Sequence, residues 1–437
     1  MTGRRVRLPL EGVRVTDITV VLAGTNAATL LADWGAEVIR VEPLHVVQPS
    51  TRGMFAHPTK EYIDATRHWV SAYPNWDPGP RPWNRWNFFN SHGRNKLSMT
   101  VDLSKPEGQQ FTRRLIALSD VFIENNVPDT FEKWDLDYER LRRIKPDLIM
   151  VRMPAYGLTG PYRTYRSFGS HIEGASGHTY LRGYHDTDPT ETEDVYFGDA
   201  SAAVAAAFAV ATALHQLRRT GKGQLIELAQ TENVVNYFGE LLLDYQMNGR
   251  IAGHAENDLG AMAPHNTYPC AGDDRWIAIA VGNDEAWQGL VRVMGNPSWA
   301  AEQRFTGQPQ RYENRRELDS LVGEWTGQHE GRWLMERLQA AGVPAGVVND
   351  DRDAFEDRHL NVRGFFETLR HPEVGVHRYP GIIWKMARTP NAIRFPPALL
   401  GQHNPYVYRE LFGVSSEEYT RLEAEGHIGA DYPDHLP

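Results

Sequence analysis

The first fifty residues change their hydrophobic pattern twice, and the changes predict a strand, a helix and a second strand. β-Branched residues dominate 13–19 and 38–41, as in buried strands. Between them, 27–34 is rich in alanine and leucine, and Gly35 stands where a helix commonly ends. A strand, helix and strand in quick succession favour a βαβ unit, and therefore an α/β fold with a parallel sheet.

Similar patterns continue along the chain. We expect helices over 105–119, 138–144, 199–217 and 231–247, and strands over 120–124, 148–151 and 224–228. Short β-branched runs around a glycine and two aspartates predict a hairpin at 268–270 and 276–281. The expected domains are a large one over 1–230, a linker helix and small α+β domain over 231–350, and a segment over 351–437 that returns to the large domain.

The segment 43–90 interrupts this alternation with prolines and aromatic residues. Four tryptophans stand out: Trp69, Trp76, Trp83 and Trp86. A long segment of this kind inside an α/β domain favours a packed excursion. The alternative is that it walls a pocket, in which case its rings indicate a sizeable apolar acid as ligand.

Composition and charge exclude several classes of protein. The chain has 437 residues, 41% of them hydrophobic, and a net charge of -10, so it lacks the general basic field that nucleic acids or anionic membranes attract. The one cysteine, Cys270, excludes a disulfide framework and multi-thiolate metal sites, and suits a reducing cytoplasm.

The longest apolar run, 202–214, is shorter than the roughly 20 residues of a spanning helix, and no secretory signal pattern opens the chain. We therefore expect a soluble, cytoplasmic protein. The glycine-rich dinucleotide fingerprint, the P-loop, the zinc-protease helix motif and the serine-hydrolase elbow do not occur. The sequence thus favours neither nicotinamide, flavin or metal chemistry nor NTP hydrolysis.

Thirteen short segments, in order over nearly the whole chain, carry a resemblance to one family. They are 10–17, 22–24, 31–42, 95–96, 101–103, 120–125, 154–157, 160–161, 176–177, 198–199, 219–224, 399–403 and 411–413. Together they resemble the class III CoA-transferases, the CaiB/BaiF family that includes formyl-CoA transferase. The resemblance implies a Rossmann-like large domain with a parallel sheet, a smaller α+β domain and an interlocked homodimer.

Asp199 is the residue that the resemblance identifies as nucleophile. It stands at the start of the alanine-rich helix predicted over 199–217, where the helix dipole and free backbone N–H groups favour an ionised carboxylate. An attacking carboxylate needs that form. From the pattern alone the favoured interpretation of this aspartate is a helix cap, and the resemblance reverses that preference.

The resemblance also implies the contacts to coenzyme A, which is a substrate here as its acyl thioester. The implied residues are Leu22, Ala23, Val101, Asp102, Leu103, Ser104, Asn125, Lys133 and Arg166. Leu22 and Ala23 follow the first strand, where a loop meets a helix N-terminus. Core packing is the alternative for these two, and a solvated surface is the alternative for Lys133 and Arg166.

The implied reaction moves CoA from an acyl-CoA, with succinyl-CoA as a plausible donor, to a small carboxylic acid through aspartyl anhydride and aspartyl-CoA thioester intermediates. One alternative is an α-methylacyl-CoA racemase-like enzyme, which needs a histidine and aspartate pair. Its histidine position matches Phe168, and His171 comes three residues later as a pocket-wall or structural histidine. A second alternative is a non-catalytic CoA-binding homologue.

Overall fold

The computed structural model describes residues 6–48, 51–68, 71–191, 195–254 and 256–437. Its contacts divide the chain into two compact units. The first, called here the sheet unit, comprises Met1–Thr179, Asp194–Asp244 and Arg363–Pro437. The second, called the small unit, comprises Tyr180–Glu193 and Tyr245–Val362.

A six-stranded, all-parallel sheet forms the centre of the sheet unit, with the strand order β3-β2-β1-β4-β5-β6. The strands are β1 (Arg14–Ile18), β2 (Glu37–Glu42), β3 (Lys96–Thr100), β4 (Val121–Glu124), β5 (Ile149–Arg152) and β6 (Gln224–Glu227). This order is that of the Rossmann fold, so the α/β class with a Rossmann-like parallel sheet is confirmed. The unpredicted strand β3 alternates buried polar residues with apolar ones, because Lys96, Ser98 and Thr100 make internal hydrogen bonds.

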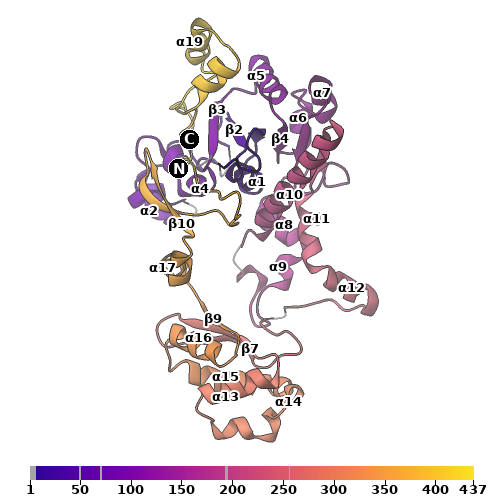
Figure 1. Cartoon of the computed structure of the whole chain (residues 1–437), viewed down its shortest axis with the longest axis vertical. Helices are drawn as coiled ribbons and strands as arrows, with labels where there is room; N and C mark the ends of the chain where they lie inside the picture. The colour runs from indigo at the N-terminus through magenta and orange to yellow at the C-terminus, as the bar shows by residue number, and fades with distance from the viewer. Residues whose placement is uncertain (1–5, 49–50, 69–70, 192–194, 255) are drawn as a thin grey trace. The chain divides into compact units, whose positions relative to one another are not determined.

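Helices cover both faces of this sheet (Figure 1). Those of the sheet unit are α1 (Ala23–Asp33), α2 (Lys60–Ala65), α3 (Pro82–Arg85), α4 (Asn87–His92), α5 (Pro106–Ala117), α6 (Asp129–Glu132), α7 (Tyr138–Ile144), α8 (Gly169–Ser176), α10 (Phe197–Thr220), α11 (Gln230–Val235), the π-helical η7 (Pro405–Leu411) and α19 (Ser416–Ala424). Between α8 and α10 lies α9 (His178–Leu181), and α12 (Gly239–Asn248) follows α11.

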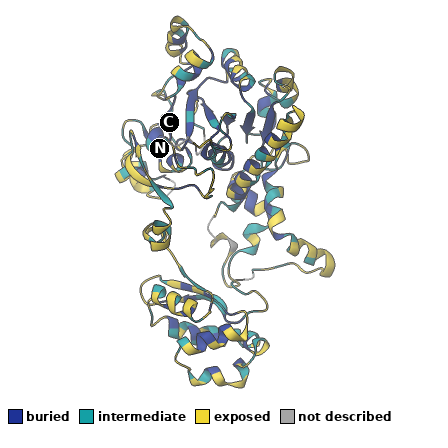
Figure 2. Ribbon diagram, in the orientation of Figure 1, coloured by how far each residue is buried: buried dark blue, intermediate teal, exposed yellow. Residues whose placement is uncertain are grey.

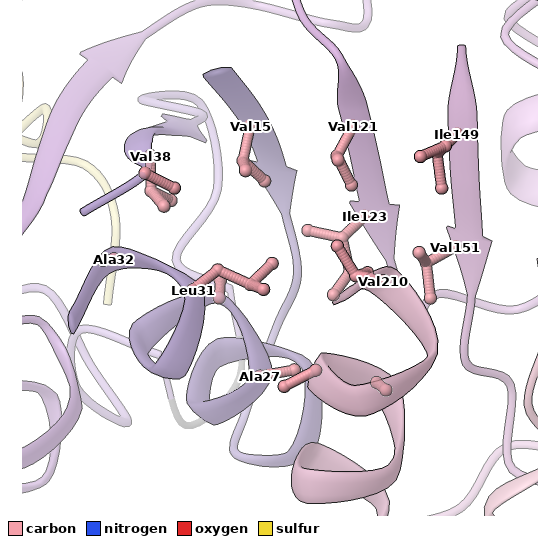
Figure 3. Packing of buried hydrophobic residues seen from close by; sticks show 14 of the residues in the cluster. Val15, Ala27, Leu31, Ala32, Val38, Val121, Ile123, Ile149, Val151 and Val210 are labelled. Carbon is pink, nitrogen blue, oxygen red and sulfur yellow. The ribbon is translucent and has the colours of Figure 1, made fainter. Parts of the chain in front are cut away.

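Helices α1 and α10 pack on one face of the sheet. Figure 3 shows Ala27 and Leu31 of α1 and Val210 of α10 against the strand residues Val15 and Val121. The many alanines on the buried side of α10 let the two helix backbones come close. On the other face, side chains from α5, α7, η7 and α19 form a second core.

Helix α10 begins two residues earlier than predicted. Tyr196 is its N-cap, in the left-handed conformation with φ 49°, so Asp199 lies inside the first turn and is not the cap. The helix has 24 residues and is long and apolar enough to cross a membrane, and 56% of its most apolar window is buried inside the fold. The core helix of a globular protein has the same properties. The helix predicted over 231–247 is interrupted by a 3-10 turn, η4 (Asn236–Phe238).

The aromatic segment 43–90 folds as the short helices α2, α3 and α4 with a 3-10 turn, η2 (Pro74–Trp76). Trp83 and Trp86 are buried, 2% and 1% exposed, in two small apolar clusters. Trp76 is 36% exposed, and Trp69 lies outside the described residues. The segment is therefore the packed excursion that its composition favoured.

Buried charged residues fill one region of the sheet unit, and we call them the Glu42 network: Asp17, Arg40, Glu42, Arg52 and Lys96. The Glu42 carboxylate accepts hydrogen bonds from Arg52 Nε at 2.6 Å and Arg40 Nε at 3.1 Å. Burial alone would raise the pKa of Glu42, but Arg52, Arg40 and the Ser98 hydroxyl lower it to about 2. This carboxylate is therefore ionised and paired.

The small unit contains a three-stranded antiparallel sheet of β7 (His265–Pro269), β8 (Trp276–Ala280) and β9 (Ala345–Val348). Its helices are η3 (Pro189–Glu191), α13 (Asp284–Val293), η5 (Ser298–Ala301), η6 (Gln303–Phe305), α14 (Gln308–Glu313), α15 (Arg315–Thr326), α16 (Gly331–Ala340), α17 (Asp351–Glu356) and α18 (Arg358–Val362). A hairpin of β10 (Phe366–His371) and β11 (Gly375–Pro380) belongs to the sheet unit. Figure 2 shows buried positions concentrated in the six-stranded sheet and the helices packed on it.

Candidate active site

The main cavity of the sheet unit lies where the strand order reverses. From the central strand β1 the sheet continues to β2 and β3 on one side, and to β4, β5 and β6 on the other. Ligands of such sheets bind in the crevice at the carboxyl ends of the strands where the order reverses, here β1 and β4. A cavity of about 580 Å³ lies here. It is lined by Val20, Val21, Asn125, Asn126, Val127, Pro128, Thr130, Pro154, Ala155, Tyr165, Arg166, Ser167, Phe168, Gly169, His171, Ile172, Asp199 and Gln230.

Two asparagines after β4 fix the loop that follows β1. Asn125 Oδ1 accepts from the Val20 N–H at 2.8 Å, and Asn125 Nδ2 donates to the Val20 carbonyl at 2.9 Å. Asn126 Nδ2 donates to the Ile18 carbonyl at 3.0 Å. The floor of the cavity is therefore a rigid pair of loops.

The loop after β1 contains a strained residue. Val21 has φ 57°, a left-handed conformation that β-branched residues rarely adopt. Its N–H donates to Thr51 Oγ1 at 3.2 Å, which helps to hold that conformation. Immediately after it, Leu22 is the N-cap of α1.

Asp199 is 5% exposed and receives a hydrogen bond from the backbone N–H of Ala23, at the start of α1. Burial raises the pKa of its carboxyl group, the Ala23 N–H opposes this, and the negative charge of Glu173 adds to it, so the pKa is about 6. The expectation that the start of α10 favours the ionised form was wrong in its net direction, because desolvation outweighs the hydrogen bond from the Ala23 N–H. At neutral pH the group is still mostly ionised.

Gly169, at the start of α8, makes room for this carboxylate. A Cβ atom at position 169 would lie 2.1 Å from Asp199 Oδ2 and 3.1 Å from the Tyr196 ring. Any side chain there would push the carboxylate away from its position. Glycine therefore suits position 169 because it leaves space for the carboxylate, and not because of its backbone angles.

Glu173 and His178 form a polar pair near Asp199. Glu173 is fully buried, its Oε2 lies 3.1 Å from His178 Nδ1, and its Oε1 accepts from the Gly198 N–H at 3.4 Å. The pattern of the sequence did not indicate Glu173, Gly169 or Gln230, since they come from α8 and α11 and meet Asp199 only in the fold. The nearby pair Ser176-Gly177 in the resemblance was the one available signal.

A sequence profile decides the family. The profile described as CoA-transferase family III matches residues 10–404. The chain belongs to this family. It resembles the succinyl-CoA--D-citramalate CoA-transferase of Chloroflexus aurantiacus at 33% identity, over 97% of this chain and 99% of that protein. It also resembles the mouse succinyl-CoA:glutarate CoA-transferase at 28% identity, over 96% of this chain and 90% of that protein.

Among solved structures, a CaiB/BaiF family protein from Brucella suis superposes with a TM-score of 0.78 at 28% identity, over 93% of this chain and 100% of that chain. These findings show that the chain is a family III CoA-transferase, and so confirm the resemblance and the enzyme class. CoA thioesters are the substrates of this class.

The structure places the expected CoA contacts of this family III enzyme in two groups. Asn125 and Arg166 line the cavity with Asp199. Among the described residues, the lining does not include 101–104, Lys133 or the side chains of Leu22 and Ala23. Leu22 and Ala23 are buried, as expected if they pack in the core, and the Ala23 N–H donates to Asp199.

Residues 101–104 follow β3. Val101 and Leu103 are buried in the core on the far face of the sheet, and Asp102 accepts hydrogen bonds from the N–H and hydroxyl of Ser104 at 3.0 and 2.6 Å. Lys133 is exposed at the end of α6. Residues 101–104 stay predicted contacts to the nucleotide and pantetheine of CoA, and Lys133 stays a predicted cation for CoA.

His171 lies in the cavity wall, and its Nδ1 accepts from the Phe168 N–H at 3.3 Å. This confirms the expected pocket-wall position. Elsewhere in the described chain, Glu107, Glu425 and His427 place ligand atoms within 4.8 Å of one another. Arg421 donates to both glutamates, so a guanidinium already balances that cluster.

Proposed function

We propose that this enzyme transfers CoA from succinyl-CoA to a small carboxylic acid, with Asp199 as the covalent nucleophile. The observation that carries the proposal is a desolvated carboxylate with a pKa of about 6 in the cavity at the strand-order reversal. Desolvation makes an ionised carboxylate a stronger nucleophile than one in water. The relatives named for succinyl-CoA support the donor.

In the first half-reaction an Asp199 oxygen attacks the thioester carbonyl carbon of the donor. The C–S bond breaks, CoA leaves as thiolate, and a mixed anhydride of Asp199 and the donor acid forms. The thiolate then attacks the Asp199 carbonyl carbon of this anhydride, which releases the donor acid as carboxylate and leaves an aspartyl-CoA thioester.

In the second half-reaction the acceptor carboxylate attacks the aspartyl thioester, and CoA thiolate leaves again. A new anhydride joins Asp199 to the acceptor. Thiolate attack on the acceptor carbonyl forms the product acyl-CoA and restores the Asp199 carboxylate. No proton is consumed, so the enzyme needs a shielded carboxylate and oxyanion donors more than an acid or base.

Two features of the site serve these steps. The 5% exposure of Asp199 limits the access of water to the anhydrides. The Ala23 N–H donates to the carboxylate, where it can stabilise the negative oxygen of the tetrahedral intermediates that form at the Asp199 carbonyl carbon.

For CoA binding we propose Arg166 and Asn125 at the cavity, with Leu22, Ala23, Val101, Asp102, Leu103, Ser104 and Lys133 as further contacts. Arg166 is an exposed cation on the cavity wall, suited to a CoA phosphate. The Asn125 amide is already bonded to Val20, so it serves CoA binding by positioning that loop at the cavity. Arg166→Ala is expected to weaken CoA binding with little effect on the maximal rate.

The deciding experiment incubates the protein with a panel of acyl-CoA donors, quenches with hydroxylamine or borohydride, and maps the modified peptide by mass spectrometry. Modification at Asp199 supports the covalent route, and Asp120→Asn, at the opposite end of β4, serves as control. CoA binding without modification by any donor contradicts it. Exchange of the α-proton would then point to racemase chemistry, and its absence to a binding protein.

We also propose a cytoplasmic homodimer. Helix α12 buries none of its residues in one chain, and Leu242, Leu243 and Met247 on it are 43%, 56% and 78% exposed. Exposed apolar side chains in such a group are typical of an interface. Sedimentation equilibrium tests this, and a monomer at micromolar concentration contradicts it.

A further inference from the structure

Gln230, the first residue of α11, has a buried acceptor atom that the proposed mechanism leaves unused. The residue is 5% exposed and lines the same cavity as Asp199. Its Nε2 donates to the Met153 carbonyl at 2.8 Å. Its Oε1 is buried and has no hydrogen-bond partner among the described residues.

The orientation of this amide follows from its surroundings. The Met153 carbonyl can only accept, so the amide nitrogen faces it and the oxygen faces the other way. The Gln230 and Thr231 N–H groups donate to the carbonyls of Pro154 and Ala155 at 3.1 and 3.0 Å. These bonds tie the start of α11 to the loop after β5, so the side chain starts from a fixed backbone.

Other amides on the cavity wall are already bonded. Asn125 uses both of its amide atoms on Val20, and Asn126 donates to Ile18. A buried acceptor without a donor is costly and uncommon, and in a cavity wall it indicates a ligand atom.

The chemistry of an amide oxygen restricts that ligand atom. It only accepts, so it repels carboxylates, phosphates and the tetrahedral oxyanion, and it complements an O–H or N–H group. A CoA-transferase has two substrate groups of that kind: the alcohol of a hydroxy acid, and the amide N–H groups of the pantetheine arm of CoA.

We propose that Gln230 Oε1 accepts a hydrogen bond from a substrate O–H or N–H group and so selects what binds beside Asp199. This rests on the proposed CoA transfer for its substrates. Gln230 is a specificity-determining residue, and it takes no part in bond making. Loss of the acceptor is expected to cost about 10- to 100-fold in kcat/KM.

The test compares Gln230→Met with the wild type, using succinyl-CoA and two matched pairs of acceptors: 2-hydroxyglutarate with glutarate, and citramalate with methylsuccinate. A fall confined to the hydroxy acids assigns the contact to the acid alcohol. An equal fall for all four acids, together with weaker calorimetric binding of CoA, assigns it to pantetheine. Gln230→Ala is the second variant if the first does not accumulate.

The matched control is Thr231→Val, because the Thr231 hydroxyl donates to the Ala155 carbonyl at 2.9 Å and makes a purely structural tie of the same kind. Two outcomes overturn the proposal. In the first, Gln230→Met leaves acceptor preference and CoA affinity within about twofold of wild type. In the second, Gln230→Met lowers the rates with all four acids to the same extent as Thr231→Val, and CoA affinity is unchanged. Binding of CoA and 2-hydroxyglutarate is measured without turnover. A failed Gln230 proposal is therefore distinguishable from a failed CoA-transfer proposal, which the wild type would show by leaving Asp199 unlabelled.

Discussion

Two buried carboxylates in the sheet unit have pKa values displaced in opposite directions. Glu42, at the end of β2, is 1% exposed and has a pKa of about 2. Asp199, in the first turn of α10, is 5% exposed and has a pKa of about 6. Burial raises the pKa of both, but Glu42 faces two guanidinium groups, whereas Asp199 has the Ala23 N–H and a nearby negative charge on Glu173.

The comparison separates a structural carboxylate from the proposed nucleophile. Paired charge makes Glu42 a stable but inert acceptor of hydrogen bonds. Among the described residues no guanidinium pairs with Asp199, so burial destabilises its ionised form in the fold, as the proposed nucleophile requires. The proposed role of Asp199 as nucleophile therefore opposes stability, as is common in active sites.

The largest effect is expected from Asp199→Asn. CoA transfer should fall by about 10³-fold or more, because an amide oxygen does not attack a thioester. Removal of the buried charge should also raise the free energy of unfolding at pH 7 by about 1–3 kcal/mol. Steady-state kinetics measures the loss of CoA transfer and thermal unfolding measures the gain in stability, with Asp120→Asn as the control variant. A destabilised Asp199→Asn would contradict the contrast with Glu42.

Glu42→Gln should lower the free energy of unfolding by about 3–5 kcal/mol, because it leaves buried guanidinium groups without their counter-charge. The control on the same strand is Glu37→Gln, whose partly exposed pair with Arg14 should contribute less than about 1 kcal/mol. Denaturant unfolding of the two variants is the measurement. Equal losses would mean that burial does not distinguish the two ion pairs.

Gly169→Ala should lower kcat/KM by about 100-fold, because the new methyl group takes the place of Asp199 Oδ2 and displaces the carboxylate. Gly174→Ala, in the same helix with open space around its Cβ position, is the matched control and should remain fully active. Unchanged activity in Gly169→Ala would show that the carboxylate can move without loss.

The smallest effect is that of pH. Activity should fall about tenfold per pH unit below about 6, as Asp199 takes up a proton. The two carboxyl groups affect the stability of the fold in opposite directions. Because the pKa of Asp199 is raised, the free energy of unfolding falls as the pH rises through 6. Because the pKa of Glu42 is lowered, its ionised form stabilises the fold above about pH 4.5, and this stabilisation is lost as the pH falls toward 2. A pH-rate profile with unfolding at each pH checks this; coincident loss of fold and activity near pH 6 would contradict it.

Local pattern predicted much of the sheet unit. Residues 13–19, 38–41 and 120–124 closely overlap β1, β2 and β4, because continuous β-branched runs have few other uses. Strand β3 escaped prediction, since Lys96, Ser98 and Thr100 look like surface residues until their buried partners are known. The helix predicted over 231–247 breaks at Asn236–Phe238, where Val235, Tyr237 and Gly239 are weak helix formers; the apolar periodicity alone did not register this local signal.

The sequence by itself determined the parallel α/β fold and, through ordered family motifs, pointed to Asp199 as the candidate nucleophile. Only the tertiary structure decided the direction of its pKa shift, the need for glycine at 169 and the unpaired oxygen of Gln230. The reason is physical: desolvation and steric contact depend on every atom within a few ångströms. At Asp199 those atoms come from α1, α8 and α10, which local periodicity cannot bring together.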